Sequence, residues 1–313
     1  MNPQKKIATR ESYGAALAEL GQDHEGLVVL DADLAGATKT STFQESFPDR
    51  HFDCGIAEAN MLCVAAGLST VGLVPFASSF AMFAAGRGFE QIRNSIGYPH
   101  LNVKIGATHG GISVGEDGAS HQCCEDFALM RSIPDMVVLC PSDDVEARAC
   151  VKAAYAHNGP VYLRFSRLAS PVFHDENYHF EIGKGEIFAE GDDVAIIATG
   201  LMVWEALAAR ETLAQDGICA TVINMPCIKP LDEELVISVA KRCGRVLTCE
   251  EHSVIGGLGE AVCGVLSRHC PVPVDRLGVQ DVFGHSGNAA SLMHEFGLDA
   301  EHIAIRAREL CKR

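Results

Sequence analysis

The sequence predicts an α/β protein made of two three-layer units, each a parallel sheet with helices on both faces. Short apolar runs typical of buried strands alternate with segments of helical periodicity along the 313 residues. The alternation occurs twice, and an irregular stretch at 171–190 separates the two series. Strands and helices in this order form parallel sheets, whose ligands gather at the carboxyl ends of the strands. We therefore expect a first domain at 1–170, a linker with short β pieces at 171–190 and a second domain at 191–313.

The first series contains five apolar runs and the helices between them. We expect helices at 9–20, where Thr9 is a candidate N-cap, at 78–96 as a pair, at 123–131 and at 143–157. The expected strands are 27–34, 73–77, 101–108, 136–140 and 161–166.

The second series repeats this pattern in a smaller unit. We expect strands at 193–200, 219–225, 245–252 and 272–279, and helices at 201–215, 232–241 and 258–268. The run GGLGE at 256–260 has the look of a phosphate loop, but it is not GxGxxG and it follows acidic residues. We interpret it as a tight turn between a strand and a helix.

Composition restricts the class of partner. Hydrophobic residues make up 48% of the chain, which is ample for a core in each domain. The formal net charge of -16 argues against nucleic acid, which is bound by cationic surfaces, although a local His and Arg pocket can still take a small anion. The amino terminus lacks the apolar run of a signal peptide, and Gly, Ser, Thr and Pro interrupt the longest uncharged segment, 59–86. We expect a cytoplasmic protein without a nucleic-acid or membrane partner.

The thirteen cysteines are odd in number and show no Cys-x-x-Cys spacing. Most of them stand in apolar surroundings and are interpreted as small core residues, for example Cys63, Cys150, Cys219 and Cys263. This usage favours a reducing compartment and argues against both a disulfide scaffold and a structural zinc site. We expect no metal ligand in this chain.

The stretch from Asp53 to Gly86 carries one carboxylate, Glu58, between Asp53 and Arg87. Glu58 begins a helical pattern that is apolar almost all round, so we expect this helix to be buried. A desolvated carboxyl group has a raised pKa and can be held protonated, as an acid that hydrogen-bonds a ligand nitrogen requires. The alternative is a carboxylate that compensates the helix dipole, and this stretch alone favours neither.

Further polar residues lie at or just beyond the expected carboxyl ends of strands in the first series. These are Asp33, His109, Asp117, His121 and Arg167. Together they predict a ligand site at that edge of the sheet.

Several motifs, in order and spacing, resemble the transketolase family of thiamine-diphosphate enzymes. They are GIAEANM, SFAMF, THGGISVGEDGASHQ, LRFSR, EEHSVIGGLGEAV and DVFGHSG. The resemblance covers nearly the whole chain, but it extends only to the carboxyl-terminal half of a full transketolase. That half comprises the pyrimidine-binding domain and the transketolase C-terminal domain. The GDG motif of the diphosphate-binding half is absent from the sequence. The chain thus resembles the C-terminal-section subunit of a split transketolase, whose N-terminal-section partner would hold the diphosphate and Mg²⁺ or Ca²⁺.

The resemblance implies roles for four residues at the cofactor. Glu58 would hydrogen-bond N1′ of the aminopyrimidine and favour the imino tautomer that removes the C2 proton. Phe83 would stack on the pyrimidine and Phe80 would line the same pocket, although without the resemblance both would be interpreted as helix core. Asp33 would lie near the thiazolium at a subunit interface.

The resemblance also implies roles at the substrate. His109 and His121 would lie near the sugar hydroxyls and the reacting carbonyl, where imidazoles can exchange protons near pH 7. Asp117 would bind a substrate hydroxyl and Arg167 a sugar phosphate. Arg164 is a weaker candidate, because strand alternation directs it to another side. The sequence leaves open the roles of Thr38, Lys39 and His285.

Three other functions compete with ketol transfer between sugar phosphates. The same two domains occur in deoxyxylulose-phosphate synthase, which CPSD at 140–143 resembles weakly, and in the β subunit of 2-oxo acid dehydrogenases. The third is a regulatory or assembly subunit, which should have lost the proton-handling residues. Since Glu58, His109 and His121 are all present, we expect an enzyme subunit, assembled as a heterotetramer around self-associating pyrimidine-binding domains.

Overall fold

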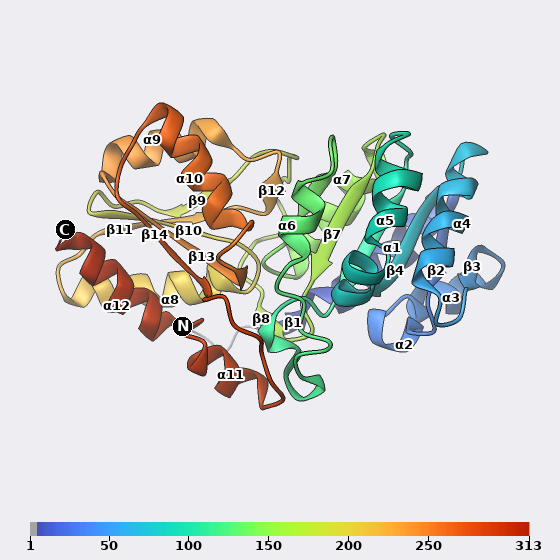
Figure 1. Ribbon diagram of the computed structural model, residues 1–313, viewed down its shortest axis with the longest axis horizontal. Coiled ribbons are helices and arrows are strands. Elements are labelled where there is room, and N and C mark those ends of the chain that lie inside the picture. Colours follow the sequence, from blue (N-terminus) through green and yellow to red (C-terminus); the bar gives the residue numbers. More distant parts are fainter. Residues whose placement is uncertain (1–4, 313) are drawn as a thin grey trace.

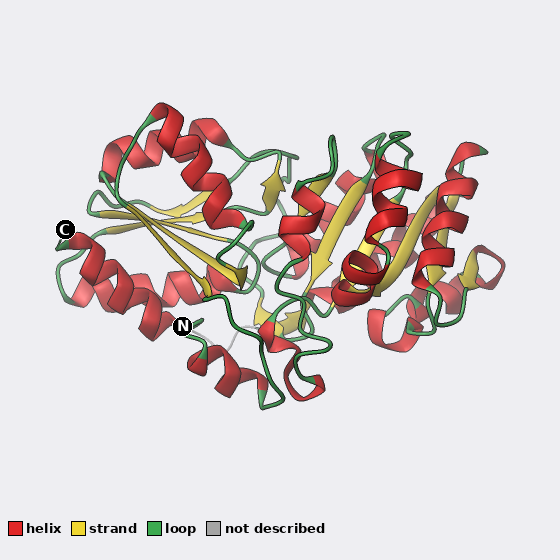
Figure 2. Ribbon diagram, viewed as in Figure 1, coloured by secondary structure: helices red, strands yellow, loops and turns green. Residues whose placement is uncertain are grey.

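The two parallel sheets are present in the computed structural model, which describes residues 5–312 (Figures 1 and 2). The larger sheet has seven strands in the order β12-β6-β7-β5-β4-β2-β3. Its parallel strands are β2 (Leu27–Asp31), β3 (His51–Asp53), β4 (Val74–Phe80), β5 (Lys104–Thr108), β6 (Val137–Leu139) and β7 (Val161–Phe165). Nearly all of their residues are buried, because helices cover both faces of the sheet.

Helices flank this sheet in two groups. α1 (Thr9–Asp23) packs against α3 (Ser41–Ser46) and α7 (Asp144–Ala156). The second group consists of α4 (Glu58–Thr70), the π-helical segments η2 (Met82–Arg87) and η3 (Ile92–Gly97), α5 (Phe89–Gln91) and α6 (Asp126–Arg131). The short α2 (Ala35–Thr38) and η1 (Pro48–Arg50) follow β2 and precede β3. The carboxyl ends of the central strands open onto α2, the start of α4 and the residues after Thr108.

The second sheet has the order β14-β13-β10-β11-β9. Its strands are β9 (Glu186–Ala189), β10 (Val194–Ala198), β11 (Ala220–Asn224), β13 (Val246–Ser253) and β14 (Val274–Val279). α8 (Met202–Gln215) and α12 (Ala300–Cys311) pack together, as do α9 (Glu233–Cys243) and α10 (Leu258–His269). α11 (Ala289–Glu295) reaches away to η4 (Ile112–Asp117) of the first unit. Both units therefore have the parallel-dominated, three-layer architecture predicted from the sequence.

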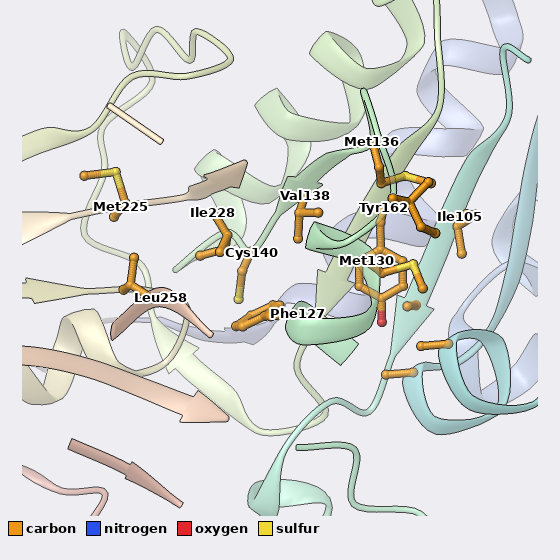
Figure 3. Close-up of a cluster of buried hydrophobic side chains, with 14 of the residues drawn as sticks. Ile105, Phe127, Met130, Met136, Val138, Cys140, Tyr162, Met225, Ile228 and Leu258 are labelled. Atoms are coloured by element: carbon orange, nitrogen blue, oxygen red, sulfur yellow. The ribbon is translucent and has the colours of Figure 1, made fainter. Parts of the chain in front are cut away.

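The two units share structure in a way that the alternation of strands and helices did not predict. β12 (Cys227–Lys229) comes from the second half of the chain but pairs antiparallel with β6, where Cys227 lies opposite Leu139. A continuous hydrophobic cluster follows the same route (Figure 3): Phe127 and Cys140 of the first unit lie beside Ile228 and Leu258. The domain boundaries at 170 and 191 stay a prediction, with residues 1–4 and 313 outside the described range.

The predicted linker contains an ordered anchor. β9 within it joins the second sheet antiparallel to β11, and β8 (Ala169–Pro171) pairs with β1 (Lys6–Ala8). Between these strands, buried His174 has Nδ1 3.0 Å from Oδ1 of Asp143 and Nε2 3.1 Å from Oε2 of Glu186. One imidazole therefore connects the start of α7 to the edge of the second sheet.

Four local expectations differ from the structure. Thr9 is not the N-cap of α1: Ala8 is, and the Thr9 hydroxyl accepts a hydrogen bond from the Ser166 amide at 2.8 Å. Residues 78–80 continue β4 instead of beginning a helix, since Ser78 pairs in register with Asp31. Seven of the thirteen cysteines are buried, as expected for most of them, but of the four named examples only Cys150 is, since Cys63 and Cys219 are exposed and Cys263 is half-buried.

The fourth difference concerns α4, which is buried on one face only. Met61, Leu62, Ala65 and Ala66 lie in the core as the periodicity indicates. The opposite face is exposed and includes Val64, which is 39% exposed. Two apolar residues that flank the helix are exposed as well, Ile56 at 75% and Val71 at 74%. Apolar composition all round a helix predicts burial of both faces, and in this chain the second face is open to a partner.

No helix in the described part of the chain is long and apolar enough to cross a membrane.

Candidate active site

A pocket of about 370 Å³ lies where the carboxyl end of β2 meets the start of α4. Nine residues line it: Ala32, Asp33, Leu34, Ile56, Glu58, Phe83, Arg87, Ser120 and His121. Four residues predicted for the site, from segments far apart in the sequence, therefore surround one cavity.

Glu58 begins α4 and is 4% exposed. Its Oε1 lies 3.1 Å from Nη1 of Arg87, at the end of η2. The Arg87 guanidinium also lies over the ring of Phe83, with Cζ 4.2 Å from the centroid. The burial of Glu58 was expected from its apolar surroundings, whereas the ion pair was not. Arg87 is 29 residues from Glu58 in the sequence, and the two meet only because η2 packs beside α4.

The aromatic side of the pocket extends inward from Phe83. The rings of Phe83 and Phe80 are stacked with centroids 5.7 Å apart, and Phe80 stacks on His109 at 3.8 Å. His121 meets Phe83 edge-on at 5.1 Å. Phe80 is buried in this stack, so the structure places the two phenylalanines and the two histidines predicted for the site in one group.

His109 directly follows β5 and has a positive φ of 60°, which is uncommon for a residue with a side chain. Its Nε2 is 3.1 Å from Nη1 of Arg10, and its Nδ1 is 2.8 Å from Oγ1 of Thr108. An arginine only donates, so Nε2 accepts and Nδ1 carries the hydrogen. The ring orientation and tautomer of His109 are thereby defined.

Burial, followed by the charges of Arg10, Arg167 and His121, lowers the pKa of His109 to about 3. The imidazole is consequently neutral at pH 7. Proton exchange by His109 near neutral pH, as expected from the sequence, does not fit this environment. His121 is half-buried at the pocket, with Nδ1 2.9 Å from the Ser120 hydroxyl.

Asp117 and Arg167 lie beyond this aromatic group and pair with each other. Nη1 of Arg167 is 3.7 Å from Oδ2 of Asp117 and 3.4 Å from Oε2 of Glu116, and it also donates to the carbonyl oxygen of Val114. Neither Asp117 nor Arg167 lines the pocket. They lie at the outer side of residues 109–122, which we call the histidine loop.

Arg10 is a site residue that the sequence reasoning missed. It lies in the first turn of α1, donates to His109 and to the carbonyl oxygen of Ala37, and has its pKa lowered by burial and by Arg167. Two guanidinium groups thus face the same region beside His109. The one feature of the sequence that could have indicated a role for Arg10 is its position in the first turn of a predicted helix, where the helix dipole disfavours a cation.

Asp33 is exposed at the rim, and its positive φ of 59° turns the chain out of β2. Its backbone amide donates to Oδ1 of Asp53 at 3.0 Å. The buried carboxylate here is Asp31, whose pKa burial raises to about 6 despite hydrogen bonds from Thr38 and Thr40. Since Thr38 is buried against Asp31, its hydroxyl does not face the pocket.

Arg164 is outside the site, as strand alternation suggested. It is 4% exposed, with Nε 3.1 Å from Oδ2 of Asp126. The turn at 256–260 is the strand-to-helix turn that was expected: the Glu250 carboxylate accepts hydrogen bonds from the amides of Leu258 and Gly259 at 2.7 and 2.8 Å. An internal carboxylate therefore occupies the anion position of this helix start.

His294, Asp299 and His302 are the one group with metal-ligand composition in the described residues. Asp299 is the N-cap of α12, and its carboxylate oxygens lie 2.6 and 2.7 Å from the two imidazoles. His285, whose role was open, has Nε2 2.9 Å from Oε1 of Glu295 at the end of α11. These contacts belong to the second unit and not to the pocket.

Comparison with known families agrees with this architecture. Residues 5–172 match the transketolase pyrimidine binding domain, and residues 183–303 match the transketolase C-terminal domain. A solved structure described as a split gene transketolase, inactive beta4 tetramer, superimposes with a TM-score of 0.92 at 52% identity, covering 98% of this chain and 99% of that one.

Relatives in sequence agree. The chain is 50% identical over 307 residues to a protein of Methanocaldococcus jannaschii named as a transketolase C-terminal section, covering 97% of this chain and 96% of that protein. A 6-deoxy-6-sulfo-D-fructose transketolase subunit of Clostridium sp. (strain MSTE9) is 44% identical over 97% of this chain and 94% of its own length. Mouse transketolase is 39% identical over 97% of this chain, which spans only 49% of that enzyme. The chain therefore belongs to the transketolase family, as a C-terminal-section subunit of a split transketolase.

Proposed function

We propose that this chain and an N-terminal-section partner subunit together form a thiamine-diphosphate-dependent transketolase. The reaction is transfer of a two-carbon ketol unit between sugar phosphates. The observation that carries the proposal is the pocket lined by both the buried carboxylate of Glu58 and the ring of Phe83, beside the stacked Phe80 and His109. Membership of the transketolase family implies the cofactor.

The pocket fits one part of that cofactor. A flat aminopyrimidine needs an aromatic surface and a carboxyl group at a ring nitrogen, and Phe83 and Glu58 offer both within about 370 Å³. The acidic lining residues are Asp33 on the rim and Glu58 inside, and the lining cation Arg87 is already paired. This donor set suits a ring better than a metal-bound diphosphate, which supports a partner that holds the diphosphate and Mg²⁺ or Ca²⁺.

When bound, thiamine diphosphate supplies the electron sink for breaking and forming a carbon–carbon bond. Glu58 holds a proton at the ring nitrogen, Phe83 orients the ring, and Asp33 lies at the rim where the thiazolium end would emerge. His109 is neutral and fixed by Arg10, so it acts as an oriented hydrogen-bonding group. His121, which borders the pocket, moves the proton at the substrate carbonyl or hydroxyl.

The substrate is anionic at the end remote from the reacting carbon. Arg10 and Arg167 both act on His109, and their mutual repulsion contributes to the lowered pKa of Arg10. An anion placed between them would relieve that repulsion, and Asp117 is positioned to accept from a sugar hydroxyl. A phosphate is the first candidate. A sulfonate is the second, favoured by the 44% identity to a sulfofructose transketolase subunit.

Assembly is proposed through the exposed apolar face of α4. Ile56 exposes apolar surface at the pocket, and Val64 and Val71 expose more along α4 and just after its end, so a partner that covers Ile56 would also close the cofactor site. The homologous solved structure is described as an inactive beta4 tetramer, which supports contact between copies of this chain in addition to contact with the N-terminal-section subunit. We propose a heterotetramer of two chains of each kind, acting in the cytoplasm.

The test is ketol transfer from xylulose 5-phosphate to ribose 5-phosphate with thiamine diphosphate and Mg²⁺. It is run on this chain alone, on the N-terminal-section subunit alone and on the mixture, and we expect activity only in the mixture. Activity of this chain alone would refute the split site. A parallel donor, 6-deoxy-6-sulfofructose, separates phosphate from sulfonate specificity.

The alternative functions have their own assays. Pyruvate with glyceraldehyde 3-phosphate tests the synthase alternative, and pyruvate with a lipoyl domain tests the dehydrogenase. Cofactor binding without turnover of any donor would favour a regulatory subunit.

A further inference from the structure

The histidine loop, residues 109–122, is enclosed by the second unit of the chain. Its helical turn η4 packs against α11, and its two ends are close to β13 and to the segment 281–287. The loop carries His109, Asp117 and His121, which are proposed to contact the substrate. The residues of the second unit that hold the loop have no role of their own in the proposed reaction.

Glu251 on β13 makes the most direct of these contacts. It is 4% exposed, and its Oε1 accepts a hydrogen bond from the Ser113 amide at 2.6 Å. A Cβ added at Gly111, where φ is +86°, would lie 2.3 Å from the same oxygen. The carboxylate therefore fills the turn just after His109 so closely that only glycine fits there.

The base of the loop is held through the same strand. The Gly111 amide donates to the carbonyl oxygen of Cys123 at 2.8 Å, which closes the loop on itself. Arg164 Nη2 then donates to that carbonyl at 3.2 Å and to the carbonyl oxygen of Glu251 at 2.8 Å. Buried Arg164 thus connects the closing point of the loop to the backbone of β13.

The far end of the loop meets the segment 281–287. Gln122 is 4% exposed, and its Nε2 donates to the carbonyl oxygens of Ile112 at 3.2 Å and His285 at 3.0 Å. A Cβ at Gly118 would lie 2.4 Å from Oγ of Ser286, so the backbones approach closely here as well. The loop has no freedom to shift without breaking a buried polar contact to the second unit.

We propose that Glu251 and the His285 carbonyl are positioning groups, through which the second domain sets the catalytic geometry of the histidine loop. The effect on catalysis rests on the proposed ketol transfer, whereas the effect on the structure of the loop does not. Loss of the Glu251 acceptor leaves the Ser113 amide buried without a partner. The loop then relaxes, and His109 and Asp117 move relative to the substrate.

Adjacent Glu250 provides a matched control, because it is equally buried on β13 but binds the start of α10 instead of the loop. The full chain is compared as wild type, E251M, E251Q and E250M by hydrogen–deuterium exchange. We expect residues 110–118 to exchange at least about tenfold faster in E251M, and E251Q, which keeps an acceptor oxygen, to stay close to wild type. E250M should accelerate exchange at 258–260 and leave the loop unchanged. Equal loop exchange in E251M and E250M, or in E251M and wild type, would overturn the proposal.

The functional readout uses the assembled enzyme. E251M should lose on the order of 10- to 100-fold in kcat/KM for the sugar donor while its Kd for thiamine diphosphate equals that of E250M. An equal kcat/KM loss in both variants would mean that Glu251 has only a structural role. If the wild-type mixture transfers no ketol group, the proposed function fails but the exchange experiment still decides the positioning. If E251M does not fold, Q122L replaces it: faster exchange at 112–122 supports the proposal, and unchanged exchange overturns it.

Discussion

The Arg87 guanidinium binds the Glu58 carboxylate at 3.1 Å while it covers the ring of Phe83 at 4.2 Å. The Glu58 carboxylate and the Phe83 ring are the two groups proposed to contact the aminopyrimidine. In the isolated chain, the planar guanidinium of Arg87 covers the Phe83 ring and pairs with the Glu58 carboxylate, so both groups have a partner. The Arg87 side chain is 55% exposed, so it can leave the pocket at small cost when the ring binds.

Replacing Arg87 with alanine should therefore tighten cofactor binding. Loss of one exposed cation–π contact and one half-exposed ion pair predicts a Kd for thiamine diphosphate lower by about three- to tenfold in the assembled protein. Calorimetric titration measures it directly. Arg93→Ala is the control, because Arg93 lies in η3 and its guanidinium donates to Asn94 instead. Weaker binding by Arg87→Ala would mean that Arg87 contacts the cofactor.

Glu58→Gln should remove proton control at the cofactor. The amide cannot deliver a proton to a ring nitrogen, so exchange of the cofactor's C2 hydrogen with solvent should slow by roughly 10²- to 10⁴-fold. NMR after acid quench of the assembled enzyme follows this exchange. Glu90→Gln changes an exposed carboxylate on α5 and should exchange at the wild-type rate. Normal exchange in the Glu58 variant would refute the assignment.

Arg167→Ala should weaken binding of the substrate's anionic end. A lost charge-assisted hydrogen bond of about 1.5–3 kcal/mol corresponds to a rise of roughly 10- to 100-fold in KM for phosphorylated sugars. Unphosphorylated donors should show little change, which separates recognition from chemistry. Arg148→Ala removes a half-buried cation that pairs with Glu19 and Asp144 away from the pocket, and serves as the control. Equal losses for both donor types would argue that Arg167 supports only the loop.

His174 should make stability fall at alkaline pH. Burial alone would lower its pKa, but Asp143 and Glu186 outweigh burial and raise the pKa to about 10. A pKa above the unfolded value of about 6.5 means that the stabilisation is complete below pH 6.5 and disappears as pH rises towards 10. The free energy of unfolding should decline in this window by up to about 1.4 kcal/mol per pH unit.

Urea unfolding of wild type and His174→Gln across this window measures the difference. The variant should be less stable at pH 6.5 and should lack the additional decline, so the two curves converge near pH 10. His179→Gln, in the same segment, is the matched surface control. Parallel curves for wild type and His174→Gln would contradict the linkage.

Strand and helix order could be predicted because each parallel strand is a short apolar run between helical segments. The polar ends of those runs lie close together, since the carboxyl ends of β2 and β5 meet at one edge of the sheet. Thus Asp33, Glu58, Phe83 and His121 do surround one pocket. The pattern of apolar and polar residues does not reveal which other side chains a given side chain contacts. The tautomer and lowered pKa of His109 depend on Arg10, which is 99 residues away in the sequence.

Other features escaped prediction for the same reason. Glu251 stands in the buried strand β13, and nothing local in the sequence indicates that its carboxylate accepts a hydrogen bond from the Ser113 amide, 138 residues earlier. Val64 on α4 is an apolar residue of the kind found in cores, yet it is 39% exposed in this chain. Composition reports that a surface is apolar and leaves open which molecule covers it.

The pairing of β12 with β6 limits how this protein can be rearranged by recombination. A gene break at the predicted linker would take Cys227–Lys229 away with the second half and leave β6 as an unprotected edge strand beside an opened hydrophobic cluster. Such halves would associate nonspecifically before they could be exchanged between relatives. We therefore expect the two units to be stable only as one chain, and a tolerated break in the gene to fall outside the segment between β6 and β12.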